Sequence, residues 1–216
     1  SLKILVDYTL KRHFANQRTS GNNAINLLNN VIKRQISLIV NWMRVGFVMG
    51  VANTDNVTIS GETIDYGPCA FMETYSPQTV FSSIDIQGRY SFGNQPVINH
   101  WNLSRFAETL IPFMAEDERE SIRIGSEIIN TFNNNFKSQW VEMMKNKLGF
   151  FGNNEQDEIF INKFLDWMNE NKADYTNTFN YLLDEEKYDN IIYKEKSFRK
   201  IKNEWKKRIN QNKIPE

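Results

Sequence analysis

Two aspartates and an asparagine occur close together in the stretch "NTDNVTISGETIDYGP", residues 53–68. Asp55, Asn56 and Asp65 all carry side-chain oxygens, and like charges at such short range repel unless something neutralises them. Carboxylate and amide oxygens are the ligands that Mg²⁺ takes, usually with water and substrate phosphates in its remaining positions. The stretch therefore predicts a magnesium site. A shared proton or a solvated turn are the alternatives, because Asp and Asn are common in turns.

The segments "VTIS" and "ETID" within this stretch alternate in character and flank a glycine, which predicts a β-hairpin. With a two-residue turn at residues 60–61, Val57 would pair with Ile64, and Asn56 would pair with Asp65. Directly opposed residues on one face of a hairpin hold their Cβ atoms about 4.5–5.5 Å apart. At that spacing the amide of Asn56 and the carboxylate of Asp65 could bind the same cation.

The order of these residues is that of a protein-kinase C-lobe: an aspartate, an asparagine, a hairpin, and an aspartate two residues before glycine. In kinases the first aspartate is the base, and the asparagine and the second aspartate hold the metal ions. Asp55 would lie at the rim of the hairpin beside the metal ligands. It is therefore the residue expected to accept the proton of an incoming hydroxyl.

Helices must position this hairpin. Apolar residues recur at helical spacing before it and after it, and we expect these stripes to face the core. The first long helix should end near Gly46 or Gly50 and lead straight into residues 53–68. Asp174 is a candidate N-cap for a later helix. The fold class is therefore mainly α with one small β-hairpin, and helices are expected at residues 25–47, 117–148, 159–168, 174–183 and 198–209.

Composition narrows the classes of partner. The 26 basic and 26 acidic residues balance, which gives no support to a nucleic-acid or membrane-surface role. The basic run at residues 194–208 is expected to be a solvated face. No apolar stretch approaches the roughly 18 residues of a membrane span. A single cysteine, Cys69, and two histidines exclude an intrachain disulfide and a Cys/His zinc cluster, so any metal would sit on oxygen ligands.

Two longer segments of the sequence resemble a known protein family. The segments "VGFVMGVANTDNVTISGETIDYGPCAFMETY" and "VFSSIDIQGRYSFGNQPVINHWNLSRFAETLIP" closely resemble the SelO family, also called YdiU, whose members are kinase-like protein adenylyltransferases. The resemblance is dense from about Trp42 to Pro112 and continues more weakly on both sides. It implies an enzyme that transfers AMP from ATP to Ser, Thr or Tyr hydroxyls of proteins, with Mg²⁺ and ATP as cofactors. Pyrophosphate is the leaving group.

The resemblance also implies individual roles. Asp55 would be the catalytic proton acceptor, Asn56 a magnesium ligand, and Asp65 a magnesium ligand that contacts the nucleotide through the ion. Arg89 falls where a kinase has its activation segment; it could orient a phosphate or pair with an acid, and a structural role is favoured. Cys69 is expected to be a small buried hydrophobe rather than the redox-active residue of many family members.

The chain departs from the family pattern at three positions. Met49 stands where family members usually carry His, Ala52 where they carry Met, and Ile86 where they often carry His. None of the three is a proposed ligand or base. Met49 is expected to pack beneath the loop, so altered loop packing is expected before any loss of chemistry.

The resemblance further implies that residues 1–216 form one C-lobe-like unit without an N-lobe. Its parts would be helices (1–50), the catalytic loop and hairpin (51–75), an activation-like segment with a helix (76–116) and a helical C-terminal part (117–216). Such a piece of a longer protein is expected to be inactive alone. The alternatives to an adenylyltransferase are a kinase that transfers the γ-phosphate and a catalytically dead scaffold. The location implied is the bacterial cytoplasm, or the mitochondrion in a eukaryote, and the oligomeric state stays open.

Overall fold

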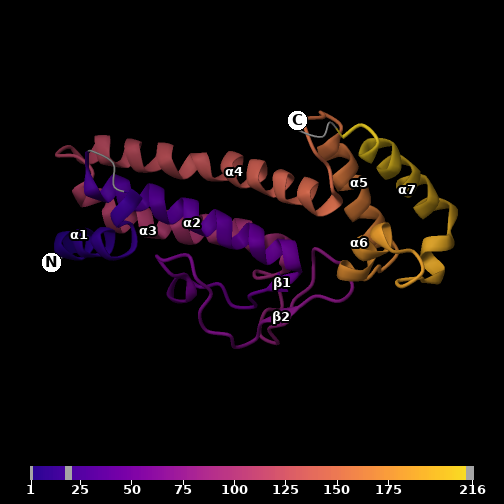
Figure 1. Ribbon diagram of the computed structural model, residues 1–216. Coiled ribbons are helices and arrows are strands. Elements are labelled where there is room, and N and C mark those ends of the chain that lie inside the picture. The colour runs from indigo at the N-terminus through magenta and orange to yellow at the C-terminus, as the bar shows by residue number, and fades with distance from the viewer. Residues whose placement is uncertain (1, 18–20, 213–216) are drawn as a thin grey trace.

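The structure is a computed structural model that describes residues 2–17 and 21–212. These residues form seven α-helices and one two-stranded antiparallel sheet, so the mainly α class is confirmed (Figure 1). The elements are α1 (Leu2–His13), α2 (Asn23–Val45), β1 (Phe47–Val48), β2 (Ala70–Phe71), α3 (Gln95–Leu110), α4 (Glu118–Leu148), α5 (Asp157–Glu170), α6 (Tyr175–Leu183) and α7 (Lys196–Ile209). Short 3₁₀ helices lie at η1 (Ala15–Gln17), η2 (Thr54–Asn56), η3 (Phe92–Asn94), η4 (Ile111–Phe113) and η5 (Ile191–Lys194).

The first long helix, α2, begins and ends with standard capping groups. The side chain of Asn22 accepts hydrogen bonds from the first backbone N–H groups of the helix. Gly46 ends it in the left-handed region at φ +73°, as the sequence predicted. A Cβ at Gly46 would lie 2.8 Å from the Tyr175 ring, so glycine is also needed there for close packing.

The later helices follow their sequence signals. Asp117 caps α4 by accepting a hydrogen bond from the Glu120 N–H at 2.8 Å, and Gly149 ends that helix in the left-handed region. Asp174 caps α6, as expected. Helices α5 and α7 cover the predicted stretches 159–168 and 198–209 and extend slightly beyond them.

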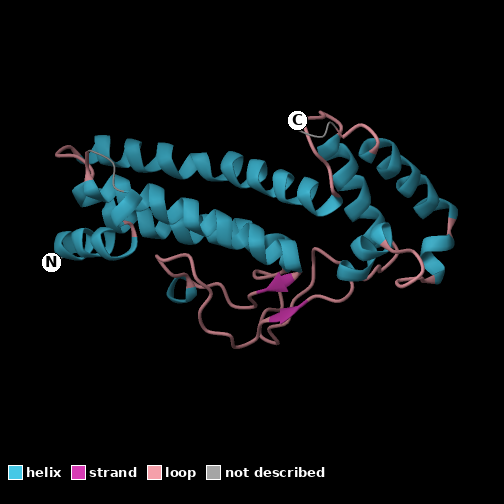
Figure 2. Cartoon of the chain, viewed as in Figure 1, coloured by secondary structure: helices cyan, strands magenta, loops and turns pink. Residues whose placement is uncertain are grey.

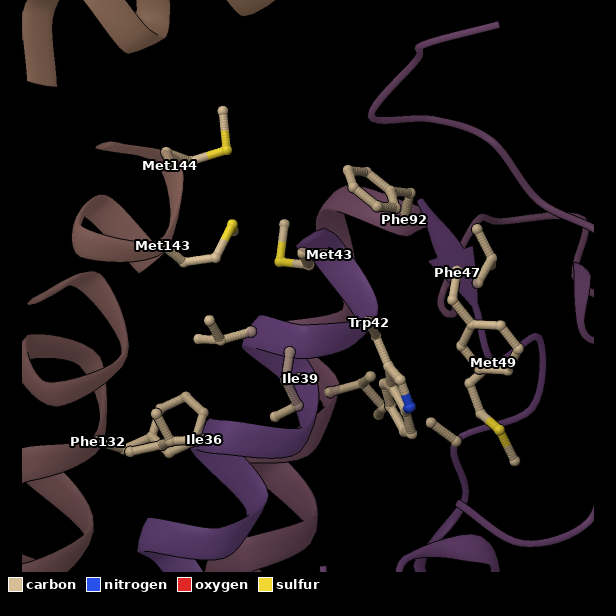
Figure 3. Close-up of a cluster of buried hydrophobic side chains, with 14 of the residues drawn as sticks. Ile36, Ile39, Trp42, Met43, Phe47, Met49, Phe92, Phe132, Met143 and Met144 are labelled. Atoms are coloured by element: carbon tan, nitrogen blue, oxygen red, sulfur yellow. The ribbon is translucent and has the colours of Figure 1, made fainter. Parts of the chain in front are cut away.

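The core lies mainly between α2, α3 and α4. Figure 1 shows α2 and α4 running side by side with α3 against them, and contacts between these three helices dominate the fold. Ile36, Ile39 and Phe132 are almost completely buried in this interface. Near its end, Met43 of α2 and Met143 of α4 point toward one another (Figure 3). The predicted apolar stripes therefore face the core.

A second cluster of aromatic side chains holds α5, α6 and α7 together. Trp167 packs against Phe198 with ring centroids 4.7 Å apart, and Tyr193 lies 5.0 Å from Phe198. The basic helix α7 is not solvated throughout. Arg208 is buried and donates to Asp157 at 2.6 and 3.0 Å, so one end of the basic run is part of the interior.

The strands differ from the prediction. The two-stranded sheet pairs Phe47 with Phe71 and Val48 with Ala70, outside the segment that was expected to form a hairpin. Residues 56–66 contain one isolated antiparallel bridge and no regular strand. Figure 2 shows β1 and β2 beside the helices, with the connecting loops on one side of α2. Among the described residues, no helix is long and apolar enough to cross a membrane.

Candidate active site

The loop between β1 and β2 carries the three residues that the sequence singled out. Asp55 and Asn56 lie in the 3₁₀ helix η2, with Asp55 exposed and Asn56 partly buried. Asp65 lies on the other arm of the loop, exposed, with its backbone in the left-handed region at φ +54°. Left-handed backbone is uncommon for residues other than glycine and occurs often at functional sites.

The predicted pairing within this loop is wrong by one residue. The isolated bridge joins Val57 to Thr63, whereas a turn at residues 60–61 would have paired Val57 with Ile64. The turn forms one residue earlier because the Gly61 N–H donates to the Thr58 carbonyl at 3.3 Å. The Thr58 hydroxyl reinforces it by bonding both to the N–H and to the carbonyl of Glu62.

This shift changes how the two expected metal ligands face each other. Beyond the bridge, the chain turns into η2 on one arm and into the left-handed Asp65 on the other, so no ladder continues outward. Asn56 and Asp65 are therefore not the directly opposed pair of a regular hairpin. Asn56 nevertheless directly precedes Val57, and Asp65 lies two residues after Thr63, so both are close in sequence to the bridge. That the two side chains bind one ion stays a prediction.

Side chains of α2 hold the turn in place. Gln35 is fully buried and donates to the Thr58 carbonyl at 2.5 Å. Arg34 donates to the Ser60 carbonyl at 2.9 Å, and the Trp42 indole N–H donates to the Thr63 hydroxyl at 2.9 Å. Hydrogen bonds to backbone carbonyls fix the backbone where no strand ladder does so.

Side chains of α3 hold the beginning of the loop. Gln95 is only 1% exposed; it donates to the Phe47 carbonyl at 3.1 Å and accepts from the Met49 N–H at 3.0 Å. Asn102 is buried and donates to the Ala52 carbonyl at 2.8 Å. Met49 is buried beneath the loop, as its position in the sequence predicted.

Part of the loop does not pack tightly against the helices. A cavity of about 320 Å³ lies between the loop and the neighbouring helices. Its walls include Thr54, Val57 and Ile59 from the loop and Leu103 and Phe106 from α3. Apolar contact is interrupted at this cavity, and the hydrogen bonds from Gln35 of α2 and Asn102 of α3 fix the loop backbone beside it.

Among the residues that the structure describes, none hydrogen-bonds or pairs with the side-chain oxygens of Asp55, Asn56 or Asp65. The Asn56 amide nitrogen donates to the Val51 carbonyl at 3.0 Å, which fixes the amide group and leaves its oxygen for another ligand. Among the described residues, no cation lies within 4.0 Å of the Asp55 or Asp65 carboxylate, and no group donates a hydrogen bond to either. Such unneutralised oxygens suit a bound cation.

The donor set fits magnesium better than a transition metal. Within residues 2–17 and 21–212, no three His, Cys, Asp or Glu side chains gather in a way that could hold a metal. A site here would consist of the Asp65 carboxylate and the Asn56 amide oxygen. Mg²⁺ commonly takes few protein oxygens and fills its octahedron with water and phosphates.

The sequence analysis missed a stripe of buried amides on α3, of which Gln95 and Asn102 hold the loop. Gln95, Asn99 and Asn102 lie at i, i+4 and i+7 on α3, and all three are buried. Side chains at that spacing share one face of a helix. A polar stripe at core spacing is therefore the signal that could have identified these residues, because buried amides require hydrogen-bond partners.

The structure also shows the surroundings of Arg89 and Cys69. The Arg89 guanidinium forms no ion pair with any described residue, and it lies over the Trp101 ring at 5.0 Å from the centroid. One of the two roles considered for Arg89 was pairing with an acid, and the described residues show no such pair. Cys69 is a partly buried thiol packed against the core.

Comparison with curated proteins first shows which class of protein the chain resembles. Curated relatives named "Protein nucleotidyltransferase YdiU" are 49% identical over 208 residues in Pelagibacter ubique and 50% identical over 208 residues in Brevibacillus brevis. Another, from Clostridium beijerinckii, is 50% identical over 212 residues. These matches cover 96%, 96% and 98% of this chain and 43%, 42% and 43% of the relatives.

The family follows from a second comparison. The family model described as "Protein adenylyltransferase SelO" matches residues 1–214, so the chain belongs to the SelO family. The resemblance stated from the sequence is therefore confirmed. The chain spans less than half the length of the curated relatives named above.

Proposed function

We propose that this chain carries the proton-accepting and metal-binding part of a Mg²⁺-dependent protein adenylyltransferase. Such an enzyme transfers AMP from ATP to Ser, Thr or Tyr hydroxyls of proteins. The observation that carries the proposal is a loop of a SelO-family chain in which Asp55, Asn56 and Asp65 present oxygens that no described residue contacts through a hydrogen bond or an ion pair. Buried side chains of α2 and α3 hold that loop at fixed points.

The proposed chemistry is a displacement at the α-phosphorus of ATP. The acceptor hydroxyl oxygen forms a bond to the α-phosphorus, the bond to the β-phosphate oxygen breaks, and pyrophosphate leaves. Asp55 accepts the hydroxyl proton. Its exposure supports this role, as does the absence of a cation partner for it within residues 2–17 and 21–212. Asn56 and Asp65 hold Mg²⁺, which neutralises charge on the phosphates when bound.

The extent of the chain bears on what it can do alone. More than half of the length of the curated relatives has no counterpart in these 216 residues. We propose that the groups that cradle the nucleotide belong to that remainder. The isolated chain should then bind ATP weakly and transfer no AMP. The relatives named above are bacterial, which supports a bacterial source, and we propose that the protein acts in the cytoplasm.

A chimera tests the proposal. Residues 2–212 would replace the matching region of the Pelagibacter ubique relative, and circular dichroism would establish that the product folds. Incubation with Mg²⁺ and ATP labelled at the α- or the γ-phosphate should leave only α-label on protein. Asp55→Asn and Asp65→Ala should each reduce that labelling by about 10²-fold or more, the scale of a lost general base or charge-stabilising group.

Other labelling patterns would contradict the proposal. Retention of γ-label would indicate a kinase, and a folded chimera that leaves neither label on protein would indicate a catalytically inactive scaffold. The isolated chain serves as a further check. AMP transfer by the 216 residues alone that is lost in Asp65→Ala would show that the proposed inactivity is wrong.

A further inference from the structure

The segment that follows β2 presents one arginine in an unusually fixed position. The Asp85 carboxylate accepts hydrogen bonds from the Arg89 and Tyr90 N–H groups, both at 2.8 Å. The Asn94 amide donates to the Arg89 carbonyl at 2.6 Å. Both sides of the Arg89 peptide backbone are therefore tied down within the loop.

The Arg89 side chain rests on aromatic rings. Its guanidinium lies 5.0 Å from the centroid of Trp101 and 5.9 Å from that of Tyr90. A guanidinium stacked in this way loses less freedom when it binds a partner, because the ring already restricts its rotamers. The Arg89 side chain is nevertheless exposed and leaves its N–H groups open to solvent.

A second arginine on the same ring provides a contrast. Arg105 lies 5.4 Å from the Trp101 centroid, but it pairs with Glu108 at 2.6 Å. Arg89 has no carboxylate within 4.0 Å among the described residues. Of the two cations on this ring, Arg89 is thus the one whose charge no described residue neutralises.

Two exposed apolar side chains lie on the face of α3 that carries Trp101, and this face adjoins the candidate catalytic loop. Val97 and Trp101 lie four residues apart on α3, on one face of the helix, and are 62% and 45% exposed. The Tyr90 hydroxyl donates to the Asn53 side chain, two residues before Asp55. A protein segment that presents a hydroxyl to Asp55 would pass close to this surface.

We propose that Arg89, together with Trp101 and Val97, binds an acidic residue and an apolar neighbour in the protein substrate, close to the acceptor hydroxyl. This inference rests on the proposed function for the identity of the partner. A guanidinium recognises a carboxylate through two parallel N–H···O bonds, and its unneutralised charge is complementary to an acidic segment. Arg89 would act as a specificity-determining residue that touches neither ATP nor the metal.

Peptide binding to the 216-residue chain tests this directly. Two fluorescein-labelled peptides would share a central Ser flanked by Leu. One would carry Glu on both sides of this centre, and the other would carry Gln at the same positions. Fluorescence anisotropy should show the Glu peptide binding about three- to ten-fold more tightly than the Gln peptide, as expected for a charge-assisted bidentate contact. Arg89→Gln should abolish that preference, Arg89→Lys should retain part of it, and Arg105→Gln should preserve it.

Several outcomes would overturn the inference. These are equal binding of the two peptides, no binding of either peptide at millimolar concentration, and an equal loss in the Arg89→Gln and Arg105→Gln variants. Self-association that disappears in Trp101→Ala would instead assign the surface to a second copy of the chain. Peptide binding does not require AMP transfer. A chimera without transfer but with a Glu preference would therefore refute only the proposed function.

Discussion

The α2–α4 helix pair and the loop at residues 49–69 are held by different kinds of interaction. The helices meet through apolar side chains such as Ile36 and Phe132, which have almost no exposed surface. The loop has one bridge and a cavity beside it, and it is positioned by hydrogen bonds from Gln35, Gln95 and Asn102. Figure 3 shows the first kind of packing.

The difference shows how a functional loop can be fixed without regular structure. Apolar packing is non-directional and tolerates small shifts, whereas an amide bonded to a backbone carbonyl fixes a particular atom. A site that must present oxygens to an ion benefits from the second kind. Loss of a helix contact should therefore affect the whole fold, and loss of a loop contact should affect the site first.

The largest expected effect comes from truncating the helix core. Phe132→Ala should lower the free energy of unfolding by about 3–5 kcal/mol, because it removes a buried ring and leaves a cavity. Urea denaturation followed by circular dichroism measures this. Phe81→Ala, at an exposed ring, is the control and should change little. A loss below about 1 kcal/mol for Phe132→Ala would show that the helix pair is not the main source of stability.

Removal of a loop contact should have the next largest effect. Gln95→Ala leaves the Met49 N–H and the Phe47 carbonyl without their partner, at a cost of about 2–3 kcal/mol. Hydrogen exchange should rise at residues 47–56 more than in α4. Gln87→Ala, at an exposed position, is the control. Uniform exchange throughout the molecule would mean that loop and helices unfold as one unit.

A smaller effect is expected at the turn. Gly61 has φ +74°, and a Cβ there would lie 2.6 Å from the Arg34 Cβ, so Gly61→Ala should cost about 1–3 kcal/mol. Gly152→Ala is a matched control, since Gly152 has φ +75° and nothing within 4 Å of the added atom. The difference between the two free energies of unfolding isolates the contact with α2. Equal values would show that the turn does not rest on that helix.

The smallest effect concerns a polar contact inside the helix scaffold. The Lys147 amine donates to the Arg44 carbonyl at 2.5 Å, while burial and then repulsion from the Arg44 charge lower the pKa of Lys147 to about 8. The unfolded chain keeps its proton up to a pKa of about 10.5. Between these values the unfolded state binds more protons, so the stability that Lys147 confers should rise with pH.

Lys147→Met provides the comparison for that titration. The stability of the wild type relative to Lys147→Met should be flat below about pH 8 and should increase by about 1 kcal/mol toward pH 10.5, after allowance for solvent screening. Urea denaturation at several pH values measures the difference. A difference that stays flat up to about pH 10.5 and falls above it would mean that the rings of Tyr175 and Phe179, 4.1 and 4.3 Å from the amine, stabilise its charge more than burial opposes it.

The sequence predicted the helices better than the loop, for a physical reason. The ends of α2 and α6 depend on local capping by Gly46 and Asp174, which can be recognised from a few neighbouring residues. The register of the turn depends on contacts with Arg34 and Gln35, some 20 residues earlier in the chain, and local alternation does not encode it.

The same distinction applies to the candidate site. The identities of Asp55, Asn56 and Asp65 could be singled out from residue type and family resemblance. The left-handed backbone of Asp65 and the amides of α3 that hold the loop could not, because they follow from tertiary packing. Sequence thus indicated which atoms to consider, and the structure showed how they are supported.

We propose that Asn56 and Asp65 bind one divalent ion. Titration of the ¹⁵N-labelled chain with Mn²⁺, followed by displacement with excess Mg²⁺, tests it most directly, because a paramagnetic ion broadens amide resonances close to it. We expect broadening centred on residues 55–57 and 64–67 that Mg²⁺ reverses and that Asp65→Asn abolishes, with Asp85→Asn as the control. Broadening that is absent there, or that persists in Asp65→Asn, would mean that Asn56 and Asp65 do not bind an ion together.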